Sequence, residues 1–183
     1  MGEVADLGAV ALQEDGEMKI IRLIKHLLHL PWLVHRKFPP ASLTKIEEAI
    51  RRSETLHHAE VRFAVESSLS FSELLQNSSC FERGVEVFSQ LRIWDTEYNN
   101  GVLIFLLLAD RNVEIIADRG LNKKISKDEW QQICHLMEQS FKKNEFEAGV
   151  LKGIEGIAKK LVLHYPEEDK NNANELSDKP VIL

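Results

Sequence analysis

NNGVLIFLLLADRNVEIIADRG, residues 99–120, is the stretch that decides the fold, because two apolar runs lie in it between three polar clusters. Residues 102–108 are apolar at every position. This is typical of a strand buried on both faces of a sheet, since a half-exposed strand would alternate between apolar and polar residues. We therefore expect helices on both faces of that sheet.

Asp110-Arg111-Asn112 is a short polar break suited to a turn, so residues 113–117 are predicted to return as an antiparallel strand. Asp110 and Asp118 then lie at opposite ends of this return strand. With a rise of about 3.3 Å per residue, roughly 20 Å or more separates them, too far to share one metal ion or act as one acid/base pair. The polar residues of the hairpin therefore form two clusters.

The segment before the hairpin predicts a partner strand. Residues 61–65 alternate between apolar and more polar side chains, as in a strand with one wetter face. A capping box, Ser79 with Glu82, opens a helix over about 79–94. A strand, a helix and a wholly apolar strand predict a parallel pair joined by a right-handed crossover. The fold class is thus α/β, a small, mostly parallel sheet with a C-terminal hairpin strand, covered by helices on both faces in the order αβαββαα.

The N-terminal boundary of this domain is predicted at Pro39-Pro40, because proline disfavours helix in the residue before it. Thr44 with Glu47 forms a capping box that predicts a helix toward His57. The segment 67–77 is predicted to be a loop with some turn character. The first strand should therefore be preceded by one helix and followed by a loop.

Two helices are predicted after the hairpin. Ser126 with Glu129 opens the first, and the second runs over about 146–164. Three glycines in the second helix cost about 1 kcal/mol each relative to alanine, so we expect them to permit close packing against a neighbour. They are Gly149, Gly153 and Gly156.

The 183 residues suit one domain with tails, and 44% hydrophobic and 28% charged residues are typical of a soluble globular chain. Residues 1–17 carry acids but no Lys or Arg, and 166–183 is rich in Asn, Asp, Glu and Lys. We expect the first to be a disordered extension and the second a flexible tail. A basic amphipathic helix with its linker, 18–38, and a domain over 39–165 lie between them.

Charge and hydropathy exclude several classes of protein. A net charge of −6 without clustered cations in the core argues against a nucleic-acid partner. The chain lacks a run of about 18 apolar residues and the pattern of a signal peptide, so we expect a cytoplasmic protein. Cys80 and Cys134 are too few and too far apart for a disulfide framework or a zinc site, and each falls in a helical pattern. Both are predicted to be buried thiols in a reducing compartment.

The segment 18–30 predicts an amphipathic helix that ends just before Trp32. Such a helix either docks on its own domain or serves as an anchor at a membrane or a partner, because an apolar face can enter the acyl boundary while cations meet anionic headgroups. The membrane contact would extend over residues 18–33. The expected solvated face comprises Lys19, Arg22, Lys25, His26 and His29, and the apolar face Ile20, Ile21, Leu23, Ile24, Leu27, Leu28 and Leu30.

Residues 61–163 resemble the TPM domain, a family named after a thylakoid lumen protein, a photosystem repair protein and a nematode receptor modulator. The motifs that carry the resemblance are Asn99 to Leu103, Asp110-Arg111, Asp118 to Leu121, and Phe146 to Gly153. The resemblance implies an α/β sandwich with a small, mostly parallel sheet. This agrees with the fold class predicted from the apolar pattern.

For function, the resemblance implies acid phosphatase activity and divalent metal binding in some members, and accessory or assembly roles in others. This chain departs from the family pattern after the third strand. Where the family tends toward Gly-aromatic-Gly-Leu-Glu, this chain has Asp118-Arg119-Gly120-Leu121-Asn122. Three of these five residues thus differ from the family pattern, at the segment from which a metal or phosphatase role would be carried over.

The first polar cluster is predicted at one end of the hairpin. Its side chains offer oxygen ligands to a hard cation such as Ca²⁺ or Mg²⁺, and Arg119 offers a fork for a phosphate. Asp118 and Arg119 are the catalytic candidates, and Asp128 is expected nearby. The alternative is a turn whose residues cap loop backbone or pair with each other. The candidate metal ligands are Asp118, Asn99, Asn100 and Glu97, with Asn122 as a further oxygen donor.

The second polar cluster is predicted at the carboxyl ends of the parallel strands, where α/β sheets usually bind ligands. The alternative is a hairpin turn whose solvated charges need no ligand. His57-His58 is expected at a helix end, where an imidazolium favours the helix dipole. None of the histidines has the spacing of a metalloprotease or deaminase site. The members of this cluster are Glu66, Ser67, Ser68, Asp110 and Arg111.

Two hypotheses follow, and they belong to different classes. The first is a binding or accessory module that acts through a protein partner and is held at the inner membrane face by the N-terminal helix. The second is a metal-assisted phosphomonoesterase, in which an ion held by Asp118 and the Asn99-Asn100 turn polarises a phosphoryl oxygen and Arg119 stabilises developing charge. No nucleophile elbow, P-loop or Rossmann glycine motif is present. The first hypothesis is favoured.

Overall fold

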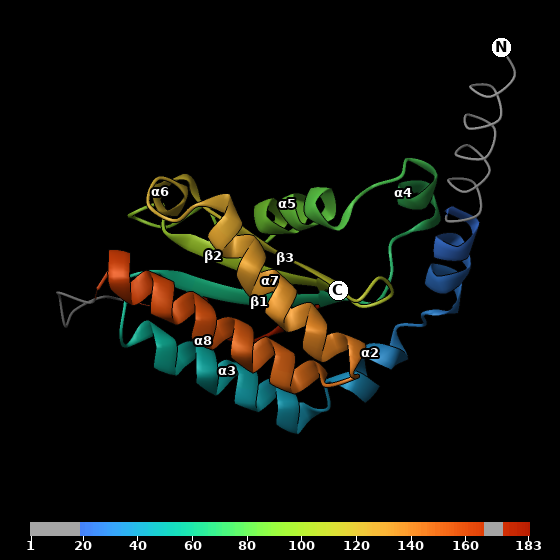
Figure 1. The fold of residues 1–183 in the computed structure, drawn as a ribbon, viewed down its shortest axis with the longest axis horizontal. Coiled ribbons are helices and arrows are strands. Elements are labelled where there is room, and N and C mark those ends of the chain that lie inside the picture. Colours follow the sequence, from blue (N-terminus) through green and yellow to red (C-terminus); the bar gives the residue numbers. More distant parts are fainter. Residues whose placement is uncertain (1–18, 167–173) are drawn as a thin grey trace, which may run out of the picture.

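A computed structural model describes residues 19–166 and 174–183 of the chain. Its centre is a sheet with the strand order β3-β2-β1-β4 (Figure 1). Strands β1 (Glu60–Glu66) and β2 (Gly101–Leu107) are parallel, and β3 (Asn112–Ala117) returns antiparallel to β2. The predicted α/β class with its hairpin strand is confirmed.

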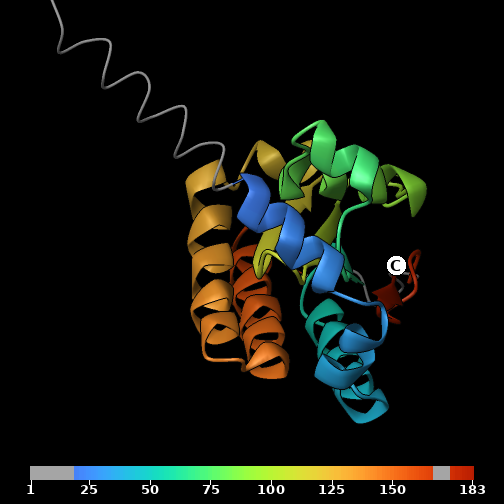
Figure 2. The same cartoon turned by 90° about the vertical axis from the view of Figure 1, so that its right-hand side faces the viewer.

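Helices cover both faces of this sheet (Figure 1). One face carries α3 (Pro40–Glu54), α7 (Lys127–Lys142) and α8 (Phe146–His164), and the other carries α5 (Cys80–Gln90). The shorter helices are α2 (Trp32–Lys37), α4 (Phe71–Leu75) and α6 (Arg119–Asn122). Residues 19–28 are also helical and are called the N-terminal helix below. This helix lies across one end of the domain (Figure 2).

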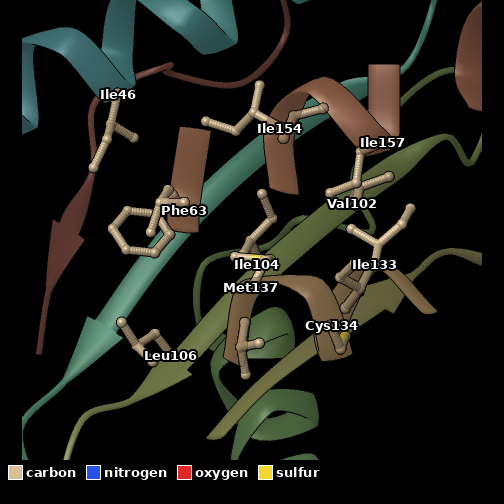
Figure 3. Close-up of a cluster of buried hydrophobic side chains, with 14 of the residues drawn as sticks. Ile46, Phe63, Val102, Ile104, Leu106, Ile133, Cys134, Met137, Ile154 and Ile157 are labelled. Carbon is tan, nitrogen blue, oxygen red and sulfur yellow. The ribbon is translucent and has the colours of Figure 1, made fainter. Parts of the chain in front are cut away.

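The central strand β2 is buried along its whole length, as its apolar sequence predicts. Val102, Ile104 and Leu106 pack toward α7 and α8 together with Met137 and Ile157 (Figure 3). The alternate residues of β2 pack on the opposite face, against α5. Consecutive strand residues point to opposite faces, so an unbroken apolar run is what two covered faces require.

Close packing between α7 and α8 explains two of the three glycines in α8. A Cβ at Gly149 would lie 2.5 Å from the ring of Phe141, and one at Gly153 would lie 2.3 Å from the sulfur of Met137. At Gly156 the nearest atoms would be 3.4 Å away, an ordinary contact. The prediction of close packing is therefore confirmed at Gly149 and Gly153, and Gly156 is not needed for it.

Two predicted boundaries were wrong. Helix α3 begins at Pro40, and Thr44 lies inside it with its hydroxyl donating to the Pro40 carbonyl. Proline suits the first turn of a helix, because the N–H that it lacks has no partner there anyway. The predicted loop 67–77 contains α4, which opens with a complete capping box of Ser70 and Glu73.

The described part of the predicted flexible tail is also different from the prediction. Residues 174–183 pack on the sheet, where β4 (Val181–Ile182) pairs in parallel with β1. The amide of Leu176 donates to Glu60 (3.0 Å), and Arg51 donates to Asp178 (3.1 Å). Strand pairing and these polar contacts hold a segment whose composition alone offers little apolar area. The predicted disordered extension 1–17 and residues 167–173 lie outside the described residues.

Both cysteines are buried free thiols, as predicted. Burial raises the pKa of Cys80, and it raises the pKa of Cys134 to about 12. Neither thiol is therefore activated as a nucleophile. Among the described residues, none of the helices is long and apolar enough to span a membrane.

Candidate functional site

The first cluster forms around a turn at Asn99, which has a left-handed backbone conformation with φ at 52°. Asparagine tolerates this conformation better than most residues. Its side-chain Oδ1 accepts hydrogen bonds from both Nε (3.0 Å) and Nη2 (2.8 Å) of Arg119. The structure thus brings Asn99 and Arg119 together at the end of the hairpin, as the sequence predicts, but the fork of Arg119 is already engaged.

Asp118 serves as the N-cap of the short helix α6. Its Oδ1 accepts from the Arg119 amide at 2.6 Å, and its Oδ2 is buried with no partner among the described residues. Asn122 closes the same turn, since its Nδ2 donates to the Ala117 carbonyl at 2.8 Å. This local pairing matches the turn alternative considered for the cluster.

The other predicted ligands diverge from Asp118. Asn100 is buried and donates its side-chain amide to the His58 carbonyl, and its Oδ1 has no hydrogen bond in the described chain. The Glu97 side chain is exposed, and its amide contacts the Glu175 carboxylate. Asp128 lines a separate surface hollow on α7.

This donor set does not fit a divalent cation in the observed arrangement. The Arg119 guanidinium occupies the Asn99 oxygen, and the Arg119 backbone amide occupies Asp118 Oδ1. Calcium and magnesium need several convergent oxygens. Within the described ranges, moreover, no three His, Cys, Asp or Glu side chains come close enough to hold a metal ion.

The second cluster is built around Asp110, and its partners come from the N-terminal helix. Arg22 reaches Asp110 Oδ2 with Nε at 3.1 Å and Nη2 at 3.0 Å, and its Nη2 also donates to the Ser78 carbonyl. His26 Nε2 lies 3.0 Å from Asp110 Oδ1. Burial alone would raise the pKa of Asp110, but the hydrogen bonds from His26 and Arg22 outweigh it and hold the pKa below its ordinary value.

His26 is the buried centre of this contact, with 3% of its surface exposed. The Leu69 amide donates to Nδ1 at 2.9 Å, so Nδ1 is an acceptor. The hydrogen-bond pattern thus assigns the ring proton to Nε2, which donates to Asp110. The prediction that His26 lies on a solvated face was wrong, because His26 and Arg22 dock on the domain, whereas Lys19 and Lys25 of the same predicted face are exposed.

The remaining members of this cluster do not converge on a ligand. The hydroxyl of Ser67 donates to the Leu30 carbonyl (3.1 Å) and that of Ser68 to the His29 carbonyl (3.3 Å), which secures the end of the N-terminal helix. Arg111 has φ at 51° in the hairpin turn and is exposed.

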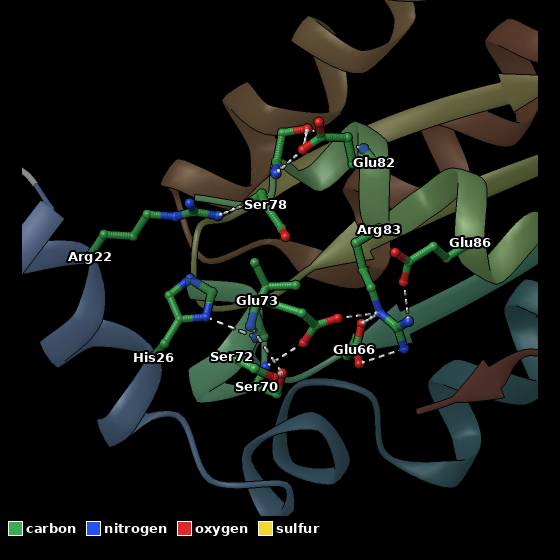
Figure 4. Close-up of polar contacts among 12 residues, drawn as sticks. Arg22, His26, Glu66, Ser70, Ser72, Glu73, Ser78, Glu82, Arg83 and Glu86 are labelled. Atoms are coloured by element: carbon green, nitrogen blue, oxygen red, sulfur yellow. Dashed lines mark hydrogen bonds and ion pairs between the residues drawn. The ribbon is translucent and has the colours of Figure 1, made fainter. Parts of the chain in front are cut away.

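Glu66 turns toward another partner, Arg83 of α5, with bonds of 2.8 and 3.1 Å (Figure 4). Arg83 also pairs with Glu73 and Glu86. The Glu66 hydrogen bonds, which outweigh burial, raise the pKa of this guanidinium. Figure 4 shows Arg22 and His26 reaching from the N-terminal helix toward this network without joining it.

Because the N-terminal helix docks through Arg22 and His26, most of its apolar side chains point outward. A hollow of about 470 Å³ lies beside this helix. It is lined by Leu23 of the helix and by Leu74 and Leu75 of α4. The following side chains are each at least half exposed and form what we call the apolar surface: Ile20, Ile21, Ile24, Leu27, Leu28, Leu30 and Trp32.

His57 also differs from its predicted environment. It lies beyond the end of α3, is fully buried, and forms an isolated β-bridge with Pro166. Burial lowers its pKa to about 4, so the ring is neutral at physiological pH. It therefore does not act as an imidazolium at a helix end.

The chain is similar to a known protein family and to solved structures. The family model of the TPM domain matches residues 37–160. The NMR structure of the BA42 protein from the psychrophilic bacterium Bizionia argentinensis is 27% identical, with a TM-score of 0.69, over 78% of this chain and 93% of that chain. The N-terminal domain of a P. gingivalis protein is 17% identical, with a TM-score of 0.57, over 71% and 81%, which shows the fold alone. A search of curated proteins found no match.

Proposed function

This chain belongs to the TPM domain family, and from that premise we propose that it is a binding module that docks peripherally on an anionic membrane surface. The proposed place is the cytoplasmic face of the inner membrane. The observation that carries the proposal is the inverted N-terminal helix, which is fixed to the domain through Arg22 and His26 and displays its apolar surface to solvent.

The apolar surface has the composition of an interfacial anchor. Burying one Leu or Ile side chain contributes about 1.5–3 kcal/mol, so several together support reversible binding to the acyl boundary. Trp32, which is 53% exposed at the start of α2, suits the headgroup level. Leu75 of α4, 67% exposed, extends the same region.

Charge around this surface favours an anionic membrane. The chain as a whole carries 29 acids and 23 Lys and Arg, yet residues 18–46 contain no Asp or Glu. Basic side chains beside an apolar face attract anionic headgroups. The cations of this segment without a carboxylate partner in the described chain are Lys19, Lys25, Arg36 and Lys37, while Arg22 and Lys45 pair with Asp110 and Glu147.

Vesicle co-sedimentation of the full chain tests the proposal. We expect binding to phosphatidylglycerol-containing vesicles and weaker binding to phosphatidylcholine alone. Ile24→Asp should weaken binding about tenfold or more, because one inserted Ile contributes about 1.5–3 kcal/mol. Leu136→Asp is the matched control, since Leu136 is 57% exposed on α7. Equal sedimentation of wild type and Ile24→Asp would overturn the proposal.

The metal-assisted phosphomonoesterase is the second hypothesis, motivated by the family resemblance. The buried, unpartnered Oδ2 of Asp118 is the observation in its favour, and the engaged fork of Arg119 argues against it. The test is hydrolysis of an aryl phosphate with and without Ca²⁺ or Mg²⁺. Metal-dependent activity that disappears in Asp118→Asn would support this hypothesis, whereas absence of activity in the wild type would favour the binding module.

A further inference from the structure

The two edges of the sheet differ. The β1 edge is covered by the chain's own β4, whereas β3 has a strand on one side only among the described residues. The Asp118 amide donates to the Gly101 carbonyl, and hydrogen-bonded pairs alternate along an antiparallel ladder. Val113, Ile115 and Ala117 therefore direct their N–H and C=O groups away from β2, toward the free edge.

Few of these outward groups have partners in the described chain. The Ala117 carbonyl accepts from Asn122, and the Ile115 amide faces the Cys134 thiol. Val113 is 1% exposed and lies outside the groove beside this edge, so its backbone groups are not open to a partner. For the Ile115 carbonyl and the Ala117 amide, whose residues line that groove, no partner is found within residues 19–166 and 174–183. Such a row of donors and acceptors is a template for one more strand.

A groove runs along this edge, because α5 and α7 both pack against β3 (Figure 1). Its volume is about 320 Å³. Phe81 of α5, which is 51% exposed, lines one part, and Ile125 and Trp130 line another. Trp130 is 4% exposed, and its indole Nε1–H has no acceptor in the described part of the chain. A buried indole usually finds one, so this donor marks the groove as incomplete by itself.

We propose that this groove binds an extended, uncharged segment of a partner protein, which adds as a strand to β3. An extended backbone satisfies the outward groups of the edge, and alternate apolar side chains fit between Phe81 and Trp130. Glu114 and Lys127 both line the groove, so its charges balance and a strongly charged segment is disfavoured. Helix walls on both sides suit a single strand better than the edge of a second copy.

This site goes beyond membrane docking. The groove is lined by residues 114–117 of β3, by Asn122 and by Trp130 near the start of α7, toward the α6 end of β3. The N-terminal helix contacts Asp110 at the other end. A domain held at a surface by its N-terminal helix therefore keeps this groove available.

A phage-displayed library of random dodecapeptides, selected on the full chain, provides the probe. We expect enriched peptides with alternating uncharged apolar residues. In NMR titrations they should shift the amide of Ala117 and the indole N–H of Trp130, which both line the groove. Two sets of peptides can be N-methylated at alternate residues. The set whose methylated nitrogens face β3 should bind at least tenfold more weakly. The set whose methylated nitrogens face away should bind within about twofold of the unmethylated peptide, as strand pairing requires.

Phe81→Asp should weaken the selected peptides at least tenfold. Phe71→Asp is the matched control, because Phe71 is 58% exposed and, like Phe81, lies in the first turn of its helix. Lack of enrichment, or peptides that bind Phe81→Asp and wild type equally, would overturn the proposal. A dimer in light scattering that Phe81→Asp dissociates would assign the edge to a second copy instead. Vesicle binding by Phe81→Asp should be unchanged, which separates this proposal from the membrane proposal.

Discussion

The N-terminal helix and α8 are both amphipathic, but they turn opposite faces toward the domain. Helix α8 buries Ile157 and Leu161 completely. The N-terminal helix instead buries His26 and leaves Leu28 70% exposed. One helix is held by apolar packing, and the other by an ion pair and hydrogen bonds to Asp110 and Leu69.

This difference shows what an amphipathic pattern determines. The pattern separates two faces, but the partner available in the folded domain decides which face turns inward. Helix α8 meets the apolar sheet and α7. The N-terminal helix meets a partly buried carboxylate at the hairpin tip, and the Arg22 cation beside Asp110 offsets the cost of partly burying that charge.

The largest expected effect is loss of packing in α8. Ile157→Ala should lower the free energy of unfolding by about 2–5 kcal/mol, because it removes buried methylenes and leaves a cavity. Leu28→Ala is the matched change on the N-terminal helix and should alter it by less than about 0.5 kcal/mol. Urea unfolding followed by circular dichroism measures both. Similar losses for the two variants would contradict the contrast between these helices.

A smaller effect is expected at the glycines of α8. Gly149→Ala places a methyl group 2.5 Å from the Phe141 ring and should destabilise the domain by about 1–3 kcal/mol. Gly156→Ala meets only ordinary contacts and should stabilise the helix by up to about 1 kcal/mol. The Tm of the Gly149→Ala variant should therefore fall and that of the Gly156→Ala variant should rise. A change of both Tm values in the same direction would refute this account of the packing.

For the N-terminal helix, the decisive change is His26→Leu. The Leu69 amide then lacks its acceptor and Asp110 lacks one donor, a loss of about 1–3 kcal/mol for a buried group. Because the N-terminal helix buries little apolar surface, we expect this loss of stabilising free energy to detach the helix locally while the rest of the domain stays folded. Amide exchange should accelerate in residues 19–28 and stay unchanged in α8. Lys25→Ala, an exposed change on the same helix, is the control, and acceleration throughout the domain would contradict the expectation.

The smallest expected effect is a pH dependence confined to the same contact. Asp110 has a folded pKa below its ordinary value of 3.8. The stabilisation is therefore complete above that value and is lost as the pH falls through the lower folded pKa. NMR signals of residues 19–28 should change in acid before those of α8. Asp110→Asn should lack this early transition, and its persistence in that variant would assign the titration to another group.

The sheet could be predicted from the sequence because the apolar run 102–108 and the turn after it are local signals. Helix α4 could also have been found, since its capping box of Ser70 and Glu73 is local. The docking of the N-terminal helix could not, because Arg22 and Asp110 are 88 residues apart along the chain.

The candidate site was predictable to a similar degree. The pairing of Asn99 with Arg119 follows from the hairpin, which brings both residues to one end of the sheet. Strand β4 was missed because its two residues give no periodic pattern, and only pairing with β1 holds them extended. The groove beside β3 depends on which strand lies at the edge, and local patterns do not determine that order.

The outward orientation of the apolar surface also has a kinetic consequence. An amphipathic helix that packs its apolar face inward must detach before it can insert, so its apparent affinity is reduced by the small fraction of open molecules. Here Arg22 and His26 hold, in the ground state, the arrangement that the proposed membrane docking requires. Association with vesicles should therefore follow a single exponential whose rate rises linearly with lipid concentration, without the plateau that a slow opening step would impose.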